Sequence, residues 1–164
     1  MREISVTNLP KSPIEMIGKD WMLITSGDKQ NYNTMTASWG GVGVLWNKNV
    51  VFAFVRPSRH TFSFLNSNEY FSLSFFDEKY RDVLSYCGKY SGRDVDKAKE
   101  CNITAQFDEN APYFDEADTV IICKKLYIQD MTEDCFIDKA LLSNYNGDDY
   151  HRVFIGEIVK VLKK

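Results

Sequence analysis

The sequence contains little of what the commonest catalytic and metal sites are made from. Two histidines and four cysteines occur in 164 residues, and no two cysteines have the Cys-x-x-Cys spacing of zinc and thiol-redox sites. A P-loop, a Gly-x-Gly-x-x-Gly turn and a Gly-x-Ser-x-Gly nucleophile elbow are all missing. We therefore expect neither metal ligands nor a catalytic acid, base or nucleophile among the side chains.

Long apolar runs, a basic excess and internal repeats are missing as well. No segment approaches the roughly 18 apolar residues of a membrane-spanning helix, and the first ten residues, MREISVTNLP, include charges. We therefore expect no membrane span, no signal peptide and a cytoplasmic protein. Twenty Lys and Arg against 23 Asp and Glu give a net charge of −3, which disfavours nucleic acid and anionic membranes as partners. Without linkers or low-complexity tracts, the chain fits one domain over 1–164.

Aromatic residues, by contrast, are frequent at 14%, and they favour strands. Apolar runs and alternation predict strands over 20–27, 34–40, 49–55, 69–76, 119–131 and 150–164. Short helices are expected over 59–67, 78–90 and 95–101, with Ser58, Asp77 and Asp94 as caps, and a turn at Asn146-Gly147. The helices are too short and irregular for a doubly wound sheet, so the pattern favours a closed antiparallel barrel.

One expected strand, NTMTASWG at 33–40, has unusually small, hydroxyl-rich side chains. Its residues alternate between two faces, one with Thr34, Thr36 and Ser38 and the other with Met35, Ala37 and Trp39. The ordinary interpretation is an amphipathic strand whose hydroxyls face solvent. The alternative is a flat wall on which a planar ligand lies close to the backbone. The segment alone favours the first interpretation.

Two further segments concentrate basic and hydroxyl groups near expected helix starts, RPSRHTFSF at 56–64 and YCGKYSGRDVDK at 86–97. Cations beside free backbone N–H groups suit an anion such as phosphate, although capped surface helices with solvated arginines are the common alternative. The widely spaced cysteines predict no disulfide framework. Cys87 lies at helical spacing from Val83 and Leu84, which favours a buried structural thiol over a redox-active one.

Taken together, these segments resemble the flavin reductase-like family of FMN-binding split barrels, which includes flavoredoxins and NAD(P)H:flavin oxidoreductases. The resemblance rests on N-x-M-T-A-S-W-G at 33–40, F-V-R-P-S-R-H-T at 54–61, F-S-L-S-F-F at 71–76, C-G-x-x-S-G-R-D-x-D-K at 87–97 and Y-H-x-x-x-I-G-E-I at 150–158. No single segment is specific, but their order and their span from residue 20 onward are.

The resemblance implies a six-stranded antiparallel Greek-key split β-barrel with short flanking helices. It also implies a homodimer that binds FMN non-covalently near the subunit interface. The family's isoalloxazine-lining positions correspond here to Asn33, Met35, Thr36, Ala37, Ser38 and Trp39, partly through their backbone groups. Its ribityl and phosphate positions correspond to Arg56, Ser58, Arg59, Thr61, Ser91, Arg93 and Lys97. His151 would lie near the ring or the dimer mate, and His60 would face the flavin or cap the surface.

The resemblance leaves three functions open. The first is an FMN-dependent oxidoreductase that takes hydride from NADH or NADPH. The second is a flavoredoxin-like electron carrier that serves a redox protein partner, toward which the compact length leans slightly. The third is a barrel that has lost flavin and serves as a binding or structural module. The presence of Arg56, Thr61, Arg93 and Lys97 argues against it. Flavin carries the hydride chemistry itself, so the absence of a catalytic triad is consistent with the first two.

Overall fold

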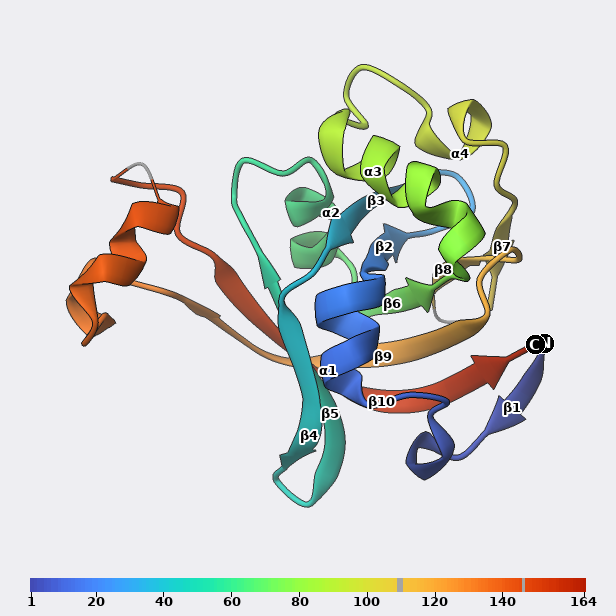
Figure 1. Cartoon of the computed structure of the whole chain (residues 1–164), viewed down its shortest axis with the longest axis horizontal. Helices are drawn as coiled ribbons and strands as arrows, with labels where there is room; N and C mark the ends of the chain where they lie inside the picture. Colours follow the sequence, from blue (N-terminus) through green and yellow to red (C-terminus); the bar gives the residue numbers. More distant parts are fainter. Residues whose placement is uncertain (109–110, 146) are drawn as a thin grey trace.

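The computed structural model describes residues 1–108, 111–145 and 147–164 and shows a mainly β protein with short helices (Figure 1). The strands are β1 (Arg2–Ile4), β2 (Met22–Gly27), β3 (Tyr32–Ala37), β4 (Gly40–Leu45), β5 (Lys48–Val55), β6 (Tyr70–Phe75), β7 (Ala105–Phe107), β8 (Pro112–Phe114), β9 (Thr119–Asp130) and β10 (Arg152–Lys163). The helical turns are η1 (Val6–Asn8), α1 (Pro13–Glu15), η2 (Met16–Asp20), α2 (Thr61–Ser67), η3 (Glu78–Tyr80), α3 (Arg81–Lys89), α4 (Lys97–Glu100), η4 (Glu133–Cys135) and η5 (Lys139–Asn144).

One antiparallel sheet forms the body of the protein. Its strand order is β3-β2-β6-β9-β10-β5-β4, and β1 adds to β10, which brings the two chain ends side by side (Figure 1). The hairpin expected from the two N-terminal strand segments is confirmed by the pairing of β2 with β3. The remaining pair, β7 and β8, forms a separate small sheet. No helix among the described residues is long and apolar enough to cross a membrane.

The strand count differs from the expected six-stranded barrel. The main sheet has eight strands, and no pairing within the described residues joins its two ends, β3 and β4. These two strands are consecutive in the chain and only Ser38 and Trp39 separate them. The expected strand 34–40 therefore spans the end of one strand and the start of another. Alternation shows that a segment is extended, but it does not show where its hydrogen-bonding partner changes from β2 to β5.

The helix starts also differ from the expected caps. The helix after β5 begins at Thr61 with His60 at the cap position, and the Ser58 side chain bonds elsewhere. The cap of α4 is Asp96, whose side chain accepts from the backbone N–H of Lys99 at 3.1 Å, in place of Asp94. The first shift has a distant cause, because Ser58 is bonded to Asp149, 91 residues along the chain, which local sequence does not record. The expected turn at Asn146-Gly147 includes a residue outside the described part of the chain.

The core lies on both sides of the sheet. One cluster inside the curved sheet includes Phe71 and Phe154, and a second lies beneath α3 and includes Leu84 and Phe114. The helices α2 and α3 pack against β2 and β3 (Figure 1). The two helices therefore cover β3, the end strand of the sheet order, which carries most of the hydroxyl-rich segment.

Gly156→Ala should be strongly destabilising because β10 passes very close to the core at this residue. A Cβ at Gly156 would lie 2.7 Å from Phe71 Cε1 and 2.8 Å from Cys123 Cβ, both in the buried cluster. Overpacking of this kind costs about 1–3 kcal/mol, which urea denaturation would measure. Gly18→Ala is the matched control, because nothing lies within 4 Å of its Cβ. Equal stability of the two variants would contradict the close approach.

Candidate functional site

The hydroxyl face of β3 does not face solvent. The Thr34 hydroxyl lies 2.9 Å from that of Thr25 and is buried, and the Thr36 hydroxyl donates to the backbone carbonyl of Leu84 in α3. A Cβ built at Gly88 of α3 would contact Thr36 at 3.4 Å. The solvent-face interpretation is therefore wrong, because the Thr34 hydroxyl is bonded within the sheet and the Thr36 hydroxyl is bonded to α3.

The other face of β3 splits between the core and the surface. Met35 is buried in the core cluster and Ala37 packs against it, so neither side chain is directed at an open site. After Ala37 the chain leaves the core, and Trp39 is 48% exposed. The Trp39 ring lies beside a hollow of about 420 Å³ that Ile14, Ser38 and other residues line. Ligand contacts from Met35 and Ala37 would therefore have to come from their backbone groups.

The two basic segments meet next to β3, although about thirty residues separate them in the chain. The Arg93 guanidinium donates to the carbonyl of Ser58 at 3.3 Å. Asn33 on β3 donates to the buried Thr61 hydroxyl at 2.8 Å. Gly92 lies directly on Asn33, since a Cβ there would be 1.9 Å from its side-chain oxygen. Glycine at this position therefore lets the second basic segment close onto the strand.

Lys97 is the central group of this junction. It is 5% exposed, and its ammonium donates to the carbonyls of Thr34 and Cys87, each at 2.8 Å. Burial lowers the pKa of Lys97 to about 8. With Asn33 and Arg93, Lys97 lines a hollow of about 450 Å³. Both of these hydrogen-bond acceptors are neutral carbonyls, so a bound anion would stabilise the buried ammonium.

The basic side chains of the two segments lie close enough to lower one another's pKa values. Burial and the cations Arg93 and Lys97 lower the pKa of His60. Burial and the nearby Arg56 likewise lower the pKa of Arg59. Several positive groups thus crowd one region of an acidic chain. The Ser91 hydroxyl is part of the same loop, where it accepts from the backbone N–H of Arg93 at 3.2 Å.

His151 lies beside Trp39, just after the end of β3. Its Nδ1 lies 2.7 Å from the Tyr145 hydroxyl, and its ring centroid lies 5.3 Å from that of Trp39. Burial, with a smaller contribution from Arg56, lowers the pKa of His151 to about 4. The imidazole is therefore neutral at pH 7 and provides a buried aromatic contact for Trp39.

His151 should make the protein less stable as the pH falls from about 6.5 to about 4. In that window the unfolded chain binds a proton at this residue and the folded chain does not, so the stability rises with pH. The shift corresponds to up to about 3 kcal/mol. Urea denaturation of wild type and His151→Gln at several pH values would measure it, and the variant should lose this slope. His60→Gln is the control and should keep most of the slope; an unchanged slope in His151→Gln would contradict the assignment.

Three residues that contact the first basic segment, Asn144, Tyr145 and Asp149, carried no signal in the sequence. Ser58 donates its backbone N–H and its hydroxyl to the Asp149 carboxylate, at 2.9 and 2.6 Å. Arg56 donates to the Asn144 carbonyl at 2.8 Å and lies 4.9 Å from the Tyr145 ring centroid. These partners come from the segment between β9 and β10, which projects away from the body (Figure 1). Only the tertiary path of that segment brings them back to the loop after β5.

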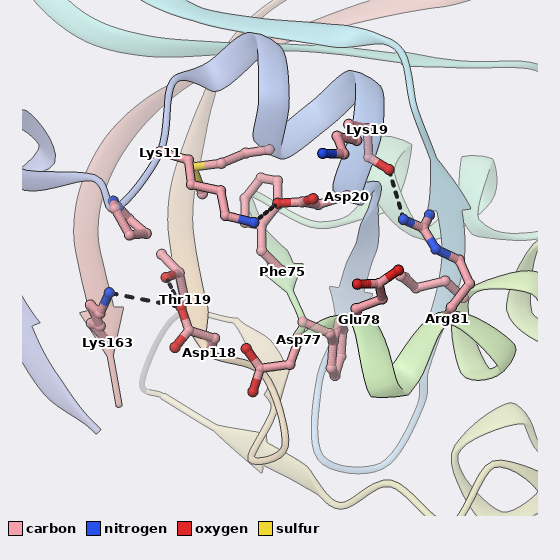
Figure 2. A pocket seen from close by; sticks show the side chains of 14 residues that line it. Lys11, Lys19, Asp20, Phe75, Asp77, Glu78, Arg81, Asp118, Thr119 and Lys163 are labelled. Atoms are coloured by element: carbon pink, nitrogen blue, oxygen red, sulfur yellow. Dashed lines mark hydrogen bonds and ion pairs between the residues drawn. The ribbon is translucent and has the colours of Figure 1, made fainter.

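A third hollow, of about 400 Å³, lies elsewhere, between the N-terminal segment and the start of α3 (Figure 2). Its charged lining balances four basic against four acidic residues, namely Lys11, Lys19, Arg81 and Lys163 against Asp20, Asp77, Glu78 and Asp118. Several of these groups already pair, as Lys11 with Asp20 at 2.6 Å. The hollow contains none of the residues expected to bind a ligand.

The structure is a β-sheet protein in which the buried Lys97 ammonium lies beside β3 and lines a hollow together with Arg93, Asp94 and Asp96. A family model described as a flavin reductase like domain matches residues 16–164. The chain belongs to the flavin reductase-like family. A search of the curated proteins finds no match.

Solved structures show the same fold at low sequence identity. Flavoredoxin from Methanosarcina acetivorans is 20% identical, with 100% of this chain and 76% of that chain covered and a TM-score of 0.72. An FMN-binding protein from Thermus thermophilus is 21% identical, with coverages of 99% and 80% and a TM-score of 0.69. The NADH:FAD oxidoreductase of Streptomyces globisporus C-1027 is 17% identical, with coverages of 88% and 75% and a TM-score of 0.65. At these identities the likenesses show the fold of the chain.

Proposed function

We propose that the protein is an FMN-binding oxidoreductase that passes electrons from NADH or NADPH through a non-covalently bound flavin. The observation that carries the proposal is the buried Lys97 ammonium, which lines a hollow that Arg93 shares. Family membership identifies flavin as the ligand class. FMN ends in a phosphate and riboflavin does not, so a buried cation at the hollow favours the mononucleotide.

The phosphate end would be held by the junction of the two basic segments. Lys97, Arg93 and Arg59 supply positive charge, and Ser58, Thr61 and Ser91 supply hydroxyl groups within the same region. At present the Asp149 carboxylate occupies both Ser58 donors. We infer that Asp149 competes with the flavin phosphate for Ser58, because two anionic groups cannot share the same two donors without repulsion.

The ring end would lie along the rest of β3, toward Ser38, Trp39 and His151. The segment from Asn33 to Ala37 extends over about 13 Å at 3.3 Å per residue, so one strand joins the phosphate region to the aromatic region. The ring would contact the backbone groups of Met35, Thr36 and Ala37. Flavin supplies the hydride and electron transfer when it is bound, and the protein orients it and excludes water.

The strand connectivity favours the six-stranded split barrel that the resemblance implies. If β3 and β4 are counted as one strand bent at Ser38 and Trp39, then the order β3-β2-β6-β9-β10-β5-β4 returns to its starting strand. Six strands then surround the core, with β1 outside them. At this point the barrel is closed by the chain through Ser38 and Trp39 and not by hydrogen bonds between β3 and β4.

A homodimer is also proposed, because one side of the molecule has exposed apolar side chains. Val44 and Trp46 at the β4–β5 hairpin are 70% and 55% exposed, and Tyr127 and Ile128 on the projecting half of β9 are 42% and 43% exposed. The rings of Trp46 and Tyr127 contact each other at 6.0 Å. Exposed apolar groups gathered in this way are typical of interaction surfaces.

Trp46→Glu should shift the protein from dimer to monomer, because a carboxylate would be buried in the proposed interface. Sedimentation velocity across a hundredfold range of protein concentration would measure the shift. Tyr90→Glu, which changes a 41% exposed side chain at the end of α3, is the control and should leave the dimer intact. A wild-type protein that remains monomeric at high concentration would contradict the dimer.

Anaerobic reduction tests the proposed function and separates it from its alternative. The protein is loaded with FMN and mixed with NADH or NADPH while the visible absorbance of flavin is followed, with dithionite as the control for a reducible flavin. Rapid bleaching by a pyridine nucleotide supports the oxidoreductase. Bleaching by dithionite alone supports the second candidate, a flavoredoxin-like electron carrier for a protein partner, which the flavoredoxin fold likeness favours. Failure to bind FMN overturns both.

A further inference from the structure

Two cysteines that lie 14 residues apart come into contact beside Lys97. Cys87 is in α3 and Cys101 directly follows α4, and their sulfur atoms are 4.0 Å apart. All the cysteines have free thiols. The two remaining cysteines differ in setting, since Cys123 is buried in the sheet and Cys135 is exposed. Only the pair at 87 and 101 is therefore placed as a dithiol.

The pair can close with a small movement. A disulfide needs a sulfur separation of about 2.05 Å, so the two atoms must approach by about 2 Å. Cys101 ends a four-residue helix, and the next residue, Asn102, has a φ of 51° that turns the chain. The side chain is thus carried by a short turn rather than by a long helix or strand. Cys87 is fixed in the buried face of α3.

The two thiols have different environments, and the difference indicates which of them would react first with an oxidant. Cys87 is fully buried, whereas Cys101 is partly exposed. Burial raises the pKa of both thiols, that of Cys87 to about 12. The hydrogen bond from the Cys87 thiol and the ammonium of Lys97 oppose this at Cys101. The negative charge is therefore better tolerated on Cys101, which is also the thiol that a small reagent can reach.

We propose that Cys87 and Cys101 form a redox-active dithiol that a hydroperoxide converts to a disulfide. The Cys101 thiol loses its proton, and the thiolate attacks the terminal peroxide oxygen and breaks the O–O bond. Cys101 becomes a sulfenic acid, and the leaving oxygen takes up the thiol proton to depart as an alcohol, or as water from hydrogen peroxide. The Cys87 sulfur then attacks the Cys101 sulfur, the S–O bond breaks, and the released hydroxide takes the Cys87 proton to leave as water. Two thiols are oxidised by two electrons and one peroxide is reduced.

The bond would close the segment that carries the second basic cluster. Lys97 is hydrogen-bonded to both cysteines. Its ammonium donates to the Cys87 carbonyl at 2.8 Å, and its backbone carbonyl accepts from the Cys101 N–H at 3.0 Å. Oxidation therefore moves a group bound directly to Lys97 and restrains the loop with Ser91 and Arg93. The expected change in FMN affinity on oxidation rests on the proposed function, whereas the disulfide itself does not.

Oxidation of a Cys135→Ser protein tests the proposal without interference from the exposed thiol. The protein is treated with hydrogen peroxide, digested without reductant and analysed by mass spectrometry. We expect linked peptides that contain Cys87 and Cys101, and a higher melting temperature than in the dithiothreitol-reduced protein. In a further Cys87→Ser change, dimedone should trap the Cys101 sulfenic acid. In a further Cys101→Ser change, Cys87 should remain a thiol.

Two results would overturn the dithiol. One is a Cys101 that proceeds to sulfinic acid while Cys87 stays reduced in the pair-intact protein. The other is a Cys87 that reacts equally fast when Cys101 is replaced. FMN affinity is then compared between oxidised and reduced protein. A mapped disulfide in a protein that binds no flavin would leave the dithiol standing and refute the proposed function, so the two failures are distinguishable.

Discussion

Lys97→Met should weaken FMN binding by about 10- to 100-fold while leaving riboflavin binding nearly unchanged. The Lys97 ammonium is buried and lines the hollow that would hold the phosphate. A charge-assisted contact to an anion contributes about 1.5–3 kcal/mol, which corresponds to that change in affinity. Riboflavin lacks the phosphate, so the ratio of the two affinities isolates this end of the ligand. Fluorescence titration of both flavins would measure it.

Lys99→Met is the matched control because it removes the same charge from the same short helix at an exposed position. It should leave the FMN-to-riboflavin ratio intact. Melting curves must show that Lys97→Met folds, since Thr34 and Cys87 lose the donor to their carbonyls. An equal loss of FMN and riboflavin affinity in a folded Lys97→Met protein would contradict a phosphate contact and indicate a structural role.

The pH dependence gives a second measure of the same contact. Burial lowers the pKa of Lys97 to about 8, and the protonated form is the one that attracts a phosphate. FMN affinity in the wild type should therefore fall as the pH rises above about 8, by up to tenfold per unit. Riboflavin affinity should not show this fall, and Lys97→Met should lose it.

Much of the fold follows from the sequence because its strands alternate clearly. The segments at 20–27, 49–55 and 69–76 each contain a strand within two residues of the expected ends. The error at 34–40 has a definite cause, since β3 ends at Ala37, β4 begins at Gly40 and the pairing partner changes from β2 to β5 between them. Burial and alternation are properties of a segment, whereas pairing depends on which other strands lie beside it.

For the candidate site, too, the sequence indicates some residues and gives no signal for others. The basic groups of the loops after β5 and α3 stand out because hydroxyls, glycines and cations are concentrated locally, and the structure brings Ser58 and Arg93 together. The contacts of Asp149 and of Cys101 had no comparable signal. Ser58 and Asp149 are 91 residues apart, so only the return of the β9–β10 segment to the body creates their pairing. Sequence therefore identified the cations but not the internal anion that opposes them.

Asp149→Asn should strengthen FMN binding by about tenfold, which corresponds to about 1.4 kcal/mol. The Asp149 carboxylate now accepts both Ser58 donors, and it lies near enough to Arg59 to oppose the burial that lowers the pKa of that group. Asparagine keeps the shape and one acceptor oxygen, but it removes the charge that a phosphate dianion would meet. Titration of the variant with FMN and with riboflavin would measure the gain, which should appear for FMN alone.

Asp94→Asn separates the Ser58 contact from a general change in charge. Asp94 is exposed and lies near enough to His60 to influence its pKa, so its replacement changes the local field by the same unit without freeing a donor. The gain at Asp149 should exceed the gain at Asp94 if the two Ser58 donors are what the phosphate needs. A loss of FMN affinity in Asp149→Asn would reverse the interpretation. The carboxylate would then hold Ser58 in place for the ligand, and the loop after β5 would depend on Asp149 for its binding geometry.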